Sequence, residues 1–398
     1  MSSDQPRIET HTRLAIRNIG LLLSGDMDQP ILDADTVVSV DGRIAAVGRA
    51  KDVDTAGATT TIDAKGTTLA PGLIDSHVHP VVGDWTPRQN QFGWIDSCMN
   101  GGVTTMISAG EVHMPGRPKD VTGVKAMAIF VQRAFTAFRP GGVQILAGAP
   151  VIEQGMVEDD FKELAAAGVN LLGEVGLGSV KDGPTARAMV GWARKHGIQS
   201  TIHTGGPSIP GSSLIDKDVV MEADADVIGH INGGHTALPD KQITSLIAES
   251  TRSLEIVHNG NERAALLTLR TAAELKQLHR VILGTDAPAG SGVQPLGILR
   301  VISALSSLGN LPAEIAICLA TGNTAKQRKL DGGLIAAGRA ANFVIMDRAQ
   351  HTAGKNLLES IQLGDLPGIG MVIIDGAVTA QRSRNTPPAT TLPEIVKR

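Results

Sequence analysis

Eight short apolar stretches recur between about residues 71 and 325, and helical candidates separate them. The stretches run from "PGLIDSHVH" at 71–79 to "RVILGTDAP" at 280–288. Helix-like segments such as "TARAMVGWARKHG" (185–197) and "DKQITSLIAES" (240–250) lie between later ones. This alternation favours parallel strands joined by crossover helices. Eight such units over roughly 250 residues match the size of a closed (β/α)8 TIM barrel, and an open doubly wound sheet is the alternative.

Both ends of the chain are rich in strand patterns. Near the N-terminus, "DTVVSVDGRIAAVG" (35–48) has Asp41-Gly42 between two apolar stretches, which is a hairpin signal. The same pattern, apolar strand-like stretches around an Asp-Gly pair, recurs in "GMVIIDGAVTA" (370–380). Because chain ends often lie close together, we expect residues 1–70 and 333–398 to form one small β-sandwich domain around a barrel of residues 71–332.

The composition excludes several classes of protein. Charged residues make up 19% of the chain and the formal net charge is −4, so no excess of positive charge favours binding to nucleic acid. Only 2% of residues are aromatic and none is tyrosine, which argues against base stacking. The polar start lacks a signal-peptide pattern and no long apolar run marks a membrane span, so we expect a cytoplasmic protein. Cys98 and Cys318 are expected to be reduced, buried filler.

Ligand-type residues recur at the ends of the predicted strands. Glu174, His203, His230, His258 and Asp286 are separated by 29, 27, 28 and 28 residues, which is one strand-helix unit each time. At the end of the first strand, "LIDSHVHP" has His77 and His79 one residue apart, so both project from the same face. In a barrel all seven side chains therefore converge on the C-terminal rim.

These residue types suggest a metal centre. Imidazoles and carboxylates suit zinc and similar transition metals. We expect Glu174 to bridge two ions, a bridging water to ionise near neutral pH, and Asp286 to hold its proton and pass it to a leaving nitrogen. Each residue has another interpretation when taken singly. His258 could contact substrate or support a ligand, and Glu174 in "GEVGLG" could be a simple rim carboxylate or part of a phosphate loop.

The motifs together resemble the amidohydrolase superfamily. They are "PGLIDSHVHP" opening the barrel, histidines ending strands five and six, "GTDAP" ending strand eight, and split flanking strands. The resemblance implies that His77, His79 and Asp286 bind the more buried metal and that His203 and His230 bind the other. Many members bridge the metals with a carbamylated lysine on strand four. Here that strand has Glu174 and no lysine, so the resemblance implies a glutamate bridge.

Loop motifs narrow the resemblance to one branch of the superfamily. The runs "GGVTTMISAGEVHMPGRPKD", "HTGGPSIPGSS" and "DAPAGSGVQPLGILR" are similar to the branch that opens a cyclic enamide. That branch converts 6-oxo-1,4,5,6-tetrahydronicotinate and water to 2-formylglutarate and ammonia. The alternatives are a deaminase, a dihydroorotase-like or imidazolonepropionase-like ring hydrolase, and a non-catalytic scaffolding relative.

Candidate substrate contacts follow the first two strands. Arg88, His113 and Arg117 lie in loops at the expected rim, and the planar fork of arginine suits a substrate carboxylate. His258 is a further candidate. The ligand types suggest two divalent transition metals, zinc or a pair that includes one iron, because histidine and carboxylate suit both. The resemblance suggests a homo-oligomer, for which we expect a tetramer, and a small cyclic amide as substrate. No partner protein is expected.

Overall fold

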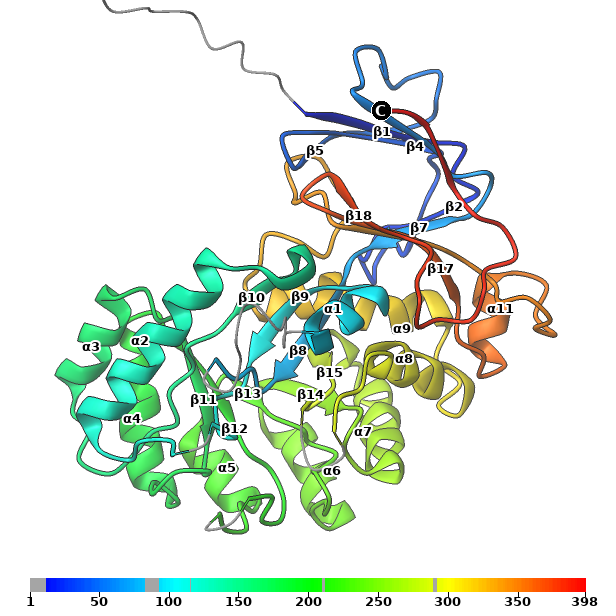
Figure 1. Cartoon of the computed structure of the whole chain (residues 1–398). Helices are drawn as coiled ribbons and strands as arrows, with labels where there is room; N and C mark the ends of the chain where they lie inside the picture. The colour runs from blue at the N-terminus through cyan, green and yellow to red at the C-terminus, as the bar shows by residue number, and fades with distance from the viewer. Residues whose placement is uncertain (1–11, 83–92, 115, 210–211, 289–291) are drawn as a thin grey trace, which may run out of the picture.

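The chain forms two regions, as Figure 1 shows in a computed structural model. The structure describes residues 12–82, 93–114, 116–209, 212–288 and 292–398. The larger region, in the lower part of the view, holds strands surrounded by helices. The smaller region, at the top, is built from strands of both chain ends.

Eight parallel strands form the centre of the larger region. Each of the predicted strand stretches contains one of them. They lie in two sheets, ordered β10-β9-β8 and β11-β12-β13-β14-β15. Their bounds are β8 Leu73–Val78, β9 Val103–Ser108, β10 Gln144–Leu146, β11 Leu171–Val175, β12 Gln199–Ile202, β13 Val227–Ile228, β14 Ser253–Val257 and β15 Val281–Gly284.

Hydrogen bonds join the edges of these two sheets on both sides. Next to β11, the Gly173 N–H donates to the Pro150 carbonyl at 3.0 Å, and the Glu174 N–H donates to the Ala109 carbonyl at 2.8 Å. Next to β15, the Asp286 N–H donates to the His77 carbonyl at 2.9 Å. The ends of β8 and β15 therefore lie side by side, although they are more than 200 residues apart in sequence.

Helices follow most of the strands and cover them from outside. Several begin at an Asp or Asn whose side chain accepts a backbone N–H, including Asp120, Asp182, Asp216 and Asn261. The bounds are α1 Gly93–Asn100, α2 Val121–Ala137, α3 Glu158–Ala166, α4 Gly183–Lys195, α5 Lys217–Ala223, α6 Asp240–Glu249, α7 Glu262–Glu274, α8 Gly297–Ser307, α9 Ala313–Leu319, α10 Gly322–Gln327 and α11 Leu357–Gln362, with short 3-10 turns at Pro140–Gly142 and Leu278–Arg280.

The smaller region consists of two sheets that share one apolar cluster. Their orders are β19-β6-β1-β4-β5 and β18-β17-β16-β7-β2-β3. The cluster takes Ile16 and Val37 from the first sheet and Leu69 and Phe343 from the second. The bounds are β1 Arg13–Arg17, β2 Leu21–Leu23, β3 Ile31–Leu32, β4 Thr36–Val40, β5 Arg43–Gly48, β6 Thr60–Asp63, β7 Thr68–Pro71, β16 Phe343–Asp347, β17 Gly368–Ile374, β18 Ala377–Gln381 and β19 Glu394–Lys397.

Two local predictions for the chain agree with the fold. Asp41 and Gly42 have positive φ angles of 48° and 76° between the antiparallel strands β4 and β5, as a tight hairpin turn requires. Cys98 and Cys318 are free and buried, and burial raises the pKa of both thiols. Within the described ranges, no helix has the length and apolar character needed to cross a membrane.

Candidate active site

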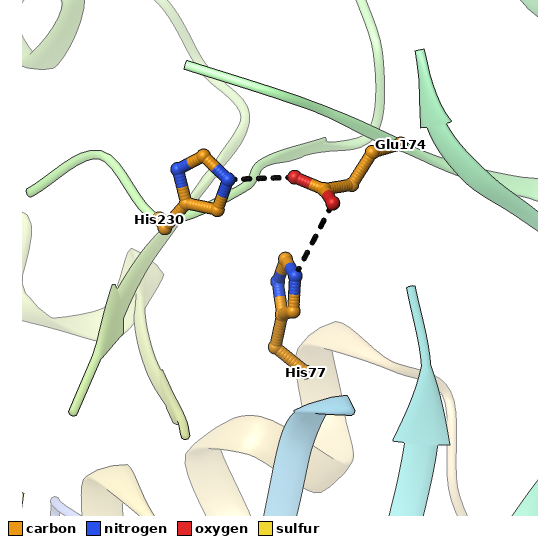
Figure 2. A group of neighbouring side chains, drawn as sticks. All are labelled: His77, Glu174 and His230. Carbon is orange, nitrogen blue, oxygen red and sulfur yellow. Dashed lines mark hydrogen bonds and ion pairs between the residues drawn. The ribbon is translucent and has the colours of Figure 1, made fainter. Parts of the chain in front are cut away.

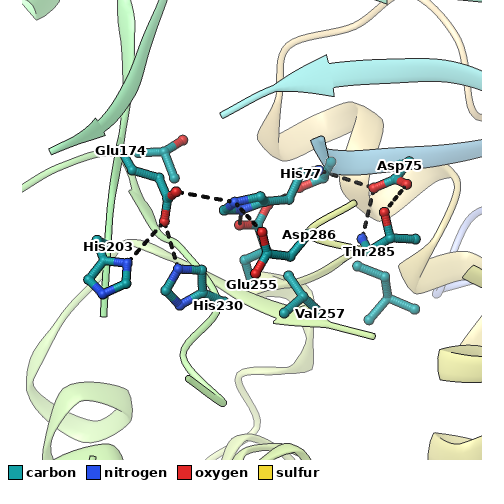
Figure 3. Close-up of polar contacts among 12 residues, drawn as sticks. Asp75, His77, Glu174, His203, His230, Glu255, Val257, Thr285 and Asp286 are labelled. Atoms are coloured by element: carbon teal, nitrogen blue, oxygen red, sulfur yellow. Dashed lines mark hydrogen bonds and ion pairs between the residues drawn. The ribbon is translucent and has the colours of Figure 1, made fainter. Parts of the chain in front are cut away.

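Six of the seven converging side chains meet at the ends of the parallel strands. His77 comes from β8 and Glu174 from β11, His79 directly follows β8, and the others follow later strands. Figure 3 shows most of this group, with Glu174 opposite His77 and the later histidines beneath it. All six residues are buried, namely His77, His79, Glu174, His203, His230 and Asp286.

The Glu174 carboxylate divides its two oxygens between two groups of imidazoles. Its Oε1 lies 2.6 Å from Nε2 of His230 and 3.3 Å from Nδ1 of His203. Its Oε2 lies 3.7 Å from Nε2 of His77 and 3.6 Å from Nε2 of His79. Figure 2 shows Glu174 between His230 and His77 with one oxygen toward each. One carboxylate therefore contacts both halves of the cluster.

Asp286 completes the half that contains His77 and His79. Its Oδ1 lies 3.0 Å from Nε2 of His79 and 3.7 Å from Nε2 of His77. Ligand atoms of His77, His79 and Asp286 lie within 4.8 Å of one another, and the same holds for His77, Glu174 and His230. Both trios therefore have the compactness that a single metal ion requires.

Hydrogen bonds on the far side of the rings determine which nitrogen faces the centre. Nδ1 of His79 donates to the Gly110 carbonyl at 2.8 Å, which leaves Nε2 facing Asp286. His203 is reversed, because its Nε2 donates to the Gly206 carbonyl at 2.8 Å and Nδ1 faces Glu174. Such hydrogen bonds orient metal-binding histidines and fix their tautomers.

Two of these residues have backbones in the left-handed region. His230 has φ of 27° and Asp286 has φ of 60°. Non-glycine residues adopt such angles at an energetic cost, and the surrounding structure must hold them there. For Asp286, the Asn259 side-chain amide donates to its backbone carbonyl at 2.8 Å. One residue before it, the backbone N–H and hydroxyl of Thr285 donate to Asp75 at 2.9 and 2.6 Å.

The charges of the site favour cations. Burial opposes the charged form of His77, but the Glu255 and Glu174 carboxylates hold its pKa well above the usual range. Burial would likewise raise the pKa of Glu174, yet the charges of His230 and His77 hold it well below its usual range. The pKa of Asp286 is lowered by His79 and His77 against the same effect of burial. The carboxylates therefore remain ionised and attract positive charge.

The side chains present fit divalent transition metals. Nε2 of His77 is buried and has no hydrogen-bond partner among the described residues, although it faces two carboxylates. A buried polar nitrogen without a partner is costly. Imidazole nitrogens together with carboxylate oxygens form the donor set that zinc and iron accept.

A pocket opens onto this cluster. Four of its lining residues are His79, Glu174, His230 and Asp286, and others come from loops. His113 lines the pocket with its ring centroid 5.2 Å from that of His79. The pKa of His113 is lowered, first by burial and then by the charge of His79. The loop residues that also line the pocket include Ser208, Ile209, His235 and Asn259.

Two predicted substrate contacts point elsewhere in the described structure. The side chain of Arg117 is nearly buried and its Nη1 donates to Glu153 at 3.1 Å, outside the residues that line the pocket. His258 lines a different cavity between α7 and α8. Arg88 lies outside the described residues. Of the four predicted contacts, only His113 therefore lies at the pocket in the described part of the chain.

The sequence interpretation missed Glu255. This residue is fully buried in the middle of β14, and its Oε2 accepts a hydrogen bond from Nδ1 of His77 at 2.6 Å. Burial acts to raise its pKa, but the charges of His77 and Arg328 lower it to about 2. Strand alternation places Glu255 and His258 on opposite faces. A glutamate inside the apolar stretch "SLEIV" was the signal that could have revealed it.

Comparisons with known proteins agree with this geometry. The model of the amidohydrolase family matches residues 68–379. The enamidase of Eubacterium barkeri is 46% identical over 385 residues, which cover 97% of this chain and 100% of the enamidase. The imidazolonepropionase of Mycolicibacterium smegmatis is 26% identical over 417 residues, covering 91% of this chain and 95% of that protein.

Solved structures give the same result. A crystal structure of enamidase superposes with a TM-score of 0.93 at 46% identity and covers 97% of this chain and 100% of that one. A crystal structure of an amidohydrolase from a Sargasso Sea sample has a TM-score of 0.65 at 16% identity, with 93% of each chain covered, and supports the fold alone. The fold is a TIM barrel with an additional domain, and the chain belongs to the amidohydrolase family.

Proposed function

We propose that this chain is a binuclear metal-dependent hydrolase that opens a cyclic amide or enamide ring. The observation that carries the proposal is the division of the Glu174 oxygens between His203 and His230 on one side and His77 and His79 on the other. A carboxylate in this position is suited to contact two cations at once. The similarity to enamidase over nearly the whole chain supports the type of ring.

The proposed ligands form two sets that share Glu174. His77, His79 and Asp286 would hold one ion, and His203 and His230 would hold the other. Zinc is the first candidate for both positions, and an iron at one of them is compatible with the same donors. When bound, two such ions supply a water molecule of lowered pKa and polarise a carbonyl oxygen.

Asp286 is the proposed proton carrier. Its carboxylate is ionised, as its lowered pKa requires, and it lies at the pocket beside His79. It takes the proton of the attacking water and delivers it to the departing ring nitrogen. The broken bond is the ring amide C–N bond, and the open-chain enamine then loses ammonia after hydration. Overall, 6-oxo-1,4,5,6-tetrahydronicotinate and two waters give 2-formylglutarate and ammonia.

The pocket walls suit a small ring that carries polar groups. His113, His235, Ser208 and Asn259 contribute side chains that donate or accept hydrogen bonds, and Ile209 and Leu177 contribute apolar surface. We propose His113 as a substrate contact because it lines the pocket beside His79, with the two rings edge to face. Arg117 is not proposed as a contact, because its guanidinium pairs with Glu153, whose other oxygen accepts from the Ser179 N–H. The Arg88 contact stays a prediction, and His258 is not proposed as a contact because it lines a different cavity.

We also infer that the eight parallel strands form one closed (β/α)8 barrel of residues 71–332. The hydrogen bonds between both pairs of sheet edges support closure. The remaining residues, 1–70 and 333–398, are then one β-sandwich domain, supported by the pairing of β7 with β16 and by the shared apolar cluster. An experimental structure at high resolution tests both boundaries. The cytoplasmic location and the tetramer stay predictions.

Metal analysis and a substrate panel test the proposed function. The purified protein is analysed for zinc and iron, and it is then incubated with lactams, cyclic enamides, dihydropyrimidines, imidazolonepropionate and adenine, with ring opening and ammonia release recorded. We expect two metals per chain and turnover of the tetrahydronicotinate lactam that a chelator abolishes. Turnover of another ring alone redirects the substrate within the family. A protein without transition metal, unaffected by chelation, contradicts the proposal.

A further inference from the structure

Glu255 connects the candidate metal centre to the barrel interior. It projects from the middle of β14 and is fully buried. Its Oε2 accepts from Nδ1 of His77 at 2.6 Å, and its Oε1 accepts from Nη2 of Arg328 at 2.9 Å and from the hydroxyl of Ser76. Figure 3 shows Glu255 close to His77. Both oxygens of this carboxylate therefore have donors.

Arg328 holds Glu255 from the far side. It follows α10 and is buried, with 6% of its surface exposed. Its Nη1 donates to the hydroxyl of Thr201 on β12 at 3.0 Å, and its Nη2 also donates to the carbonyl of Ser76 on β8 at 2.9 Å. The guanidinium thus contacts three strands at once, β8, β12 and β14. Glu255 has little freedom to turn away from His77.

Which group donates and which accepts is fixed at each of these contacts. A guanidinium only donates hydrogen bonds, so Oε1 of Glu255 must accept. An ionised carboxylate only accepts, so Oε2 requires a proton on Nδ1 of His77. Nε2 of His77 is then the nitrogen that faces Glu174 and Asp286.

We propose that Glu255 and Arg328 are positioning residues for His77, holding its ring in the orientation and tautomer that present Nε2 to a metal ion. This inference rests on the proposed function and adds to it a residue pair outside the ligand set. His79 and His203 donate instead to backbone carbonyls of Gly110 and Gly206. His77 alone, among the described rings of the cluster, has a carboxylate beyond it. Such a partner orients the ring and makes it a better ligand.

Glu255→Gln tests the proposal with almost no change of volume. Arg328 and Ser76 both donate, so they retain the carbonyl oxygen of the new side chain, and its NH2 group faces Nδ1 of His77. That amide donates, and Nδ1 must then accept, so the proton of the ring moves to Nε2 and points into the site. We expect metal content to fall from two ions per chain to about one, and chelator competition to show about 10- to 100-fold weaker zinc binding.

Two further variants separate positioning from a general loss of structure. Glu111→Gln also replaces a fully buried carboxyl group by an amide; this carboxyl accepts from Ser108 and from the Gly148 N–H, and no hydrogen bond or ion pair joins it to a histidine among the described residues. We expect it to retain two ions at pH 7. Ser76→Ala removes only the hydroxyl that donates to Glu255, and we expect a few-fold weakening of zinc binding. Thermal unfolding of the metal-free proteins verifies that all three variants fold.

Substitution of the metal by cobalt gives a signal that a loss of packing alone would not change. In the cobalt protein, the Nδ1–H of a metal-bound histidine gives a paramagnetically shifted proton signal. We expect one such signal to exchange slowly with water in the wild type and to disappear in Glu255→Gln. Two ions, unchanged zinc affinity and an unchanged signal in Glu255→Gln overturn the inference while the proposed function stands. A wild-type protein that binds no metal overturns both.

Discussion

Nε2 of His77 and Oε2 of Glu174 are 3.7 Å apart, beyond hydrogen-bond distance, although both side chains are buried. The same nitrogen lies 3.7 Å from Oδ1 of Asp286. A buried imidazole nitrogen that faces two ionised oxygens without bonding to either is suited to share a cation with them. The predictions below follow from this relationship and from the residues that maintain it.

Glu174→Gln should reduce metal content, because an amide replaces the carboxylate that faces both groups of histidines. We expect fewer than one ion per chain on average and activity at least about 100-fold lower. Metal analysis of the purified protein measures the first and ammonia release the second. Glu163→Gln is the control, because Glu163 is an exposed residue that pairs with Lys125 on the barrel surface. Two retained ions with wild-type activity in Glu174→Gln would refute the shared-ligand assignment.

Asp286→Asn should lose turnover while the protein still folds. The amide cannot accept and release the reaction proton, so we expect kcat to fall by about 100- to 10,000-fold. The fold should persist because the Asp286 backbone, rather than its side chain, receives the hydrogen bond of Asn259. Steady-state kinetics and thermal unfolding measure the two effects. The exposed Asp240→Asn is a suitable comparison, and near-normal kcat in Asp286→Asn removes Asp286 from proton transfer.

Gly284→Ala should displace His77. A methyl group at Gly284 would lie 2.7 Å from Cβ of His77 and 3.0 Å from its backbone nitrogen. Moving the strand backbone away from the new methyl group costs energy. We therefore expect a loss of about 1–3 kcal/mol in the free energy of unfolding and reduced metal content.

The matched control for this substitution is Gly191→Ala. Gly191 lies in α4, and a methyl group there meets no atom within 4 Å. Replacing glycine by alanine inside a helix should stabilise the protein by up to about 1 kcal/mol. Urea unfolding of both variants provides the comparison. Equal stability and equal metal content in the two variants contradict the close contact between Gly284 and His77.

Glu111 should make folding stability depend on pH. Burial raises its pKa from 4.5 to about 7. Between these values the unfolded chain loses the proton and the folded chain keeps it, so stability falls as the pH rises from about 4.5 to about 7. The effect is full below the lower value, is lost above the higher one, and amounts to up to about 3 kcal/mol.

Glu111→Gln should remove this contribution. Burial also raises the pKa of Asp75 to about 7, so the wild-type curve contains more than one group. The difference between wild type and Glu111→Gln isolates Glu111. We therefore expect the free energies of unfolding in urea to converge at about pH 4 and the variant to be more stable at pH 8. Parallel curves across this range would show that Glu111 does not titrate there.

Much of the site followed from local patterns in the sequence. Alternation along a strand put His77 and His79 on one side, and one strand-helix unit between ligand-type residues predicted that Glu174, His203, His230 and Asp286 would meet. Both inferences depend only on backbone geometry that repeats along the chain. The hairpin at Asp41-Gly42 is local in the same sense, because the turn depends on the two residues that form it.

The spacing of the strand-helix units did not determine which side chains reach the site; the tertiary structure did. His258 has the correct spacing but the wrong strand face, whereas Glu255, three residues earlier, reaches His77 from 178 residues away. The guanidinium of Arg117 could bind a substrate carboxylate, but in the structure it forms an ion pair with Glu153. The sequence by itself determined which side chains could gather at the barrel rim. Only the folded structure decided which nitrogen of each ring faces the centre, because that choice depends on partners brought close by packing.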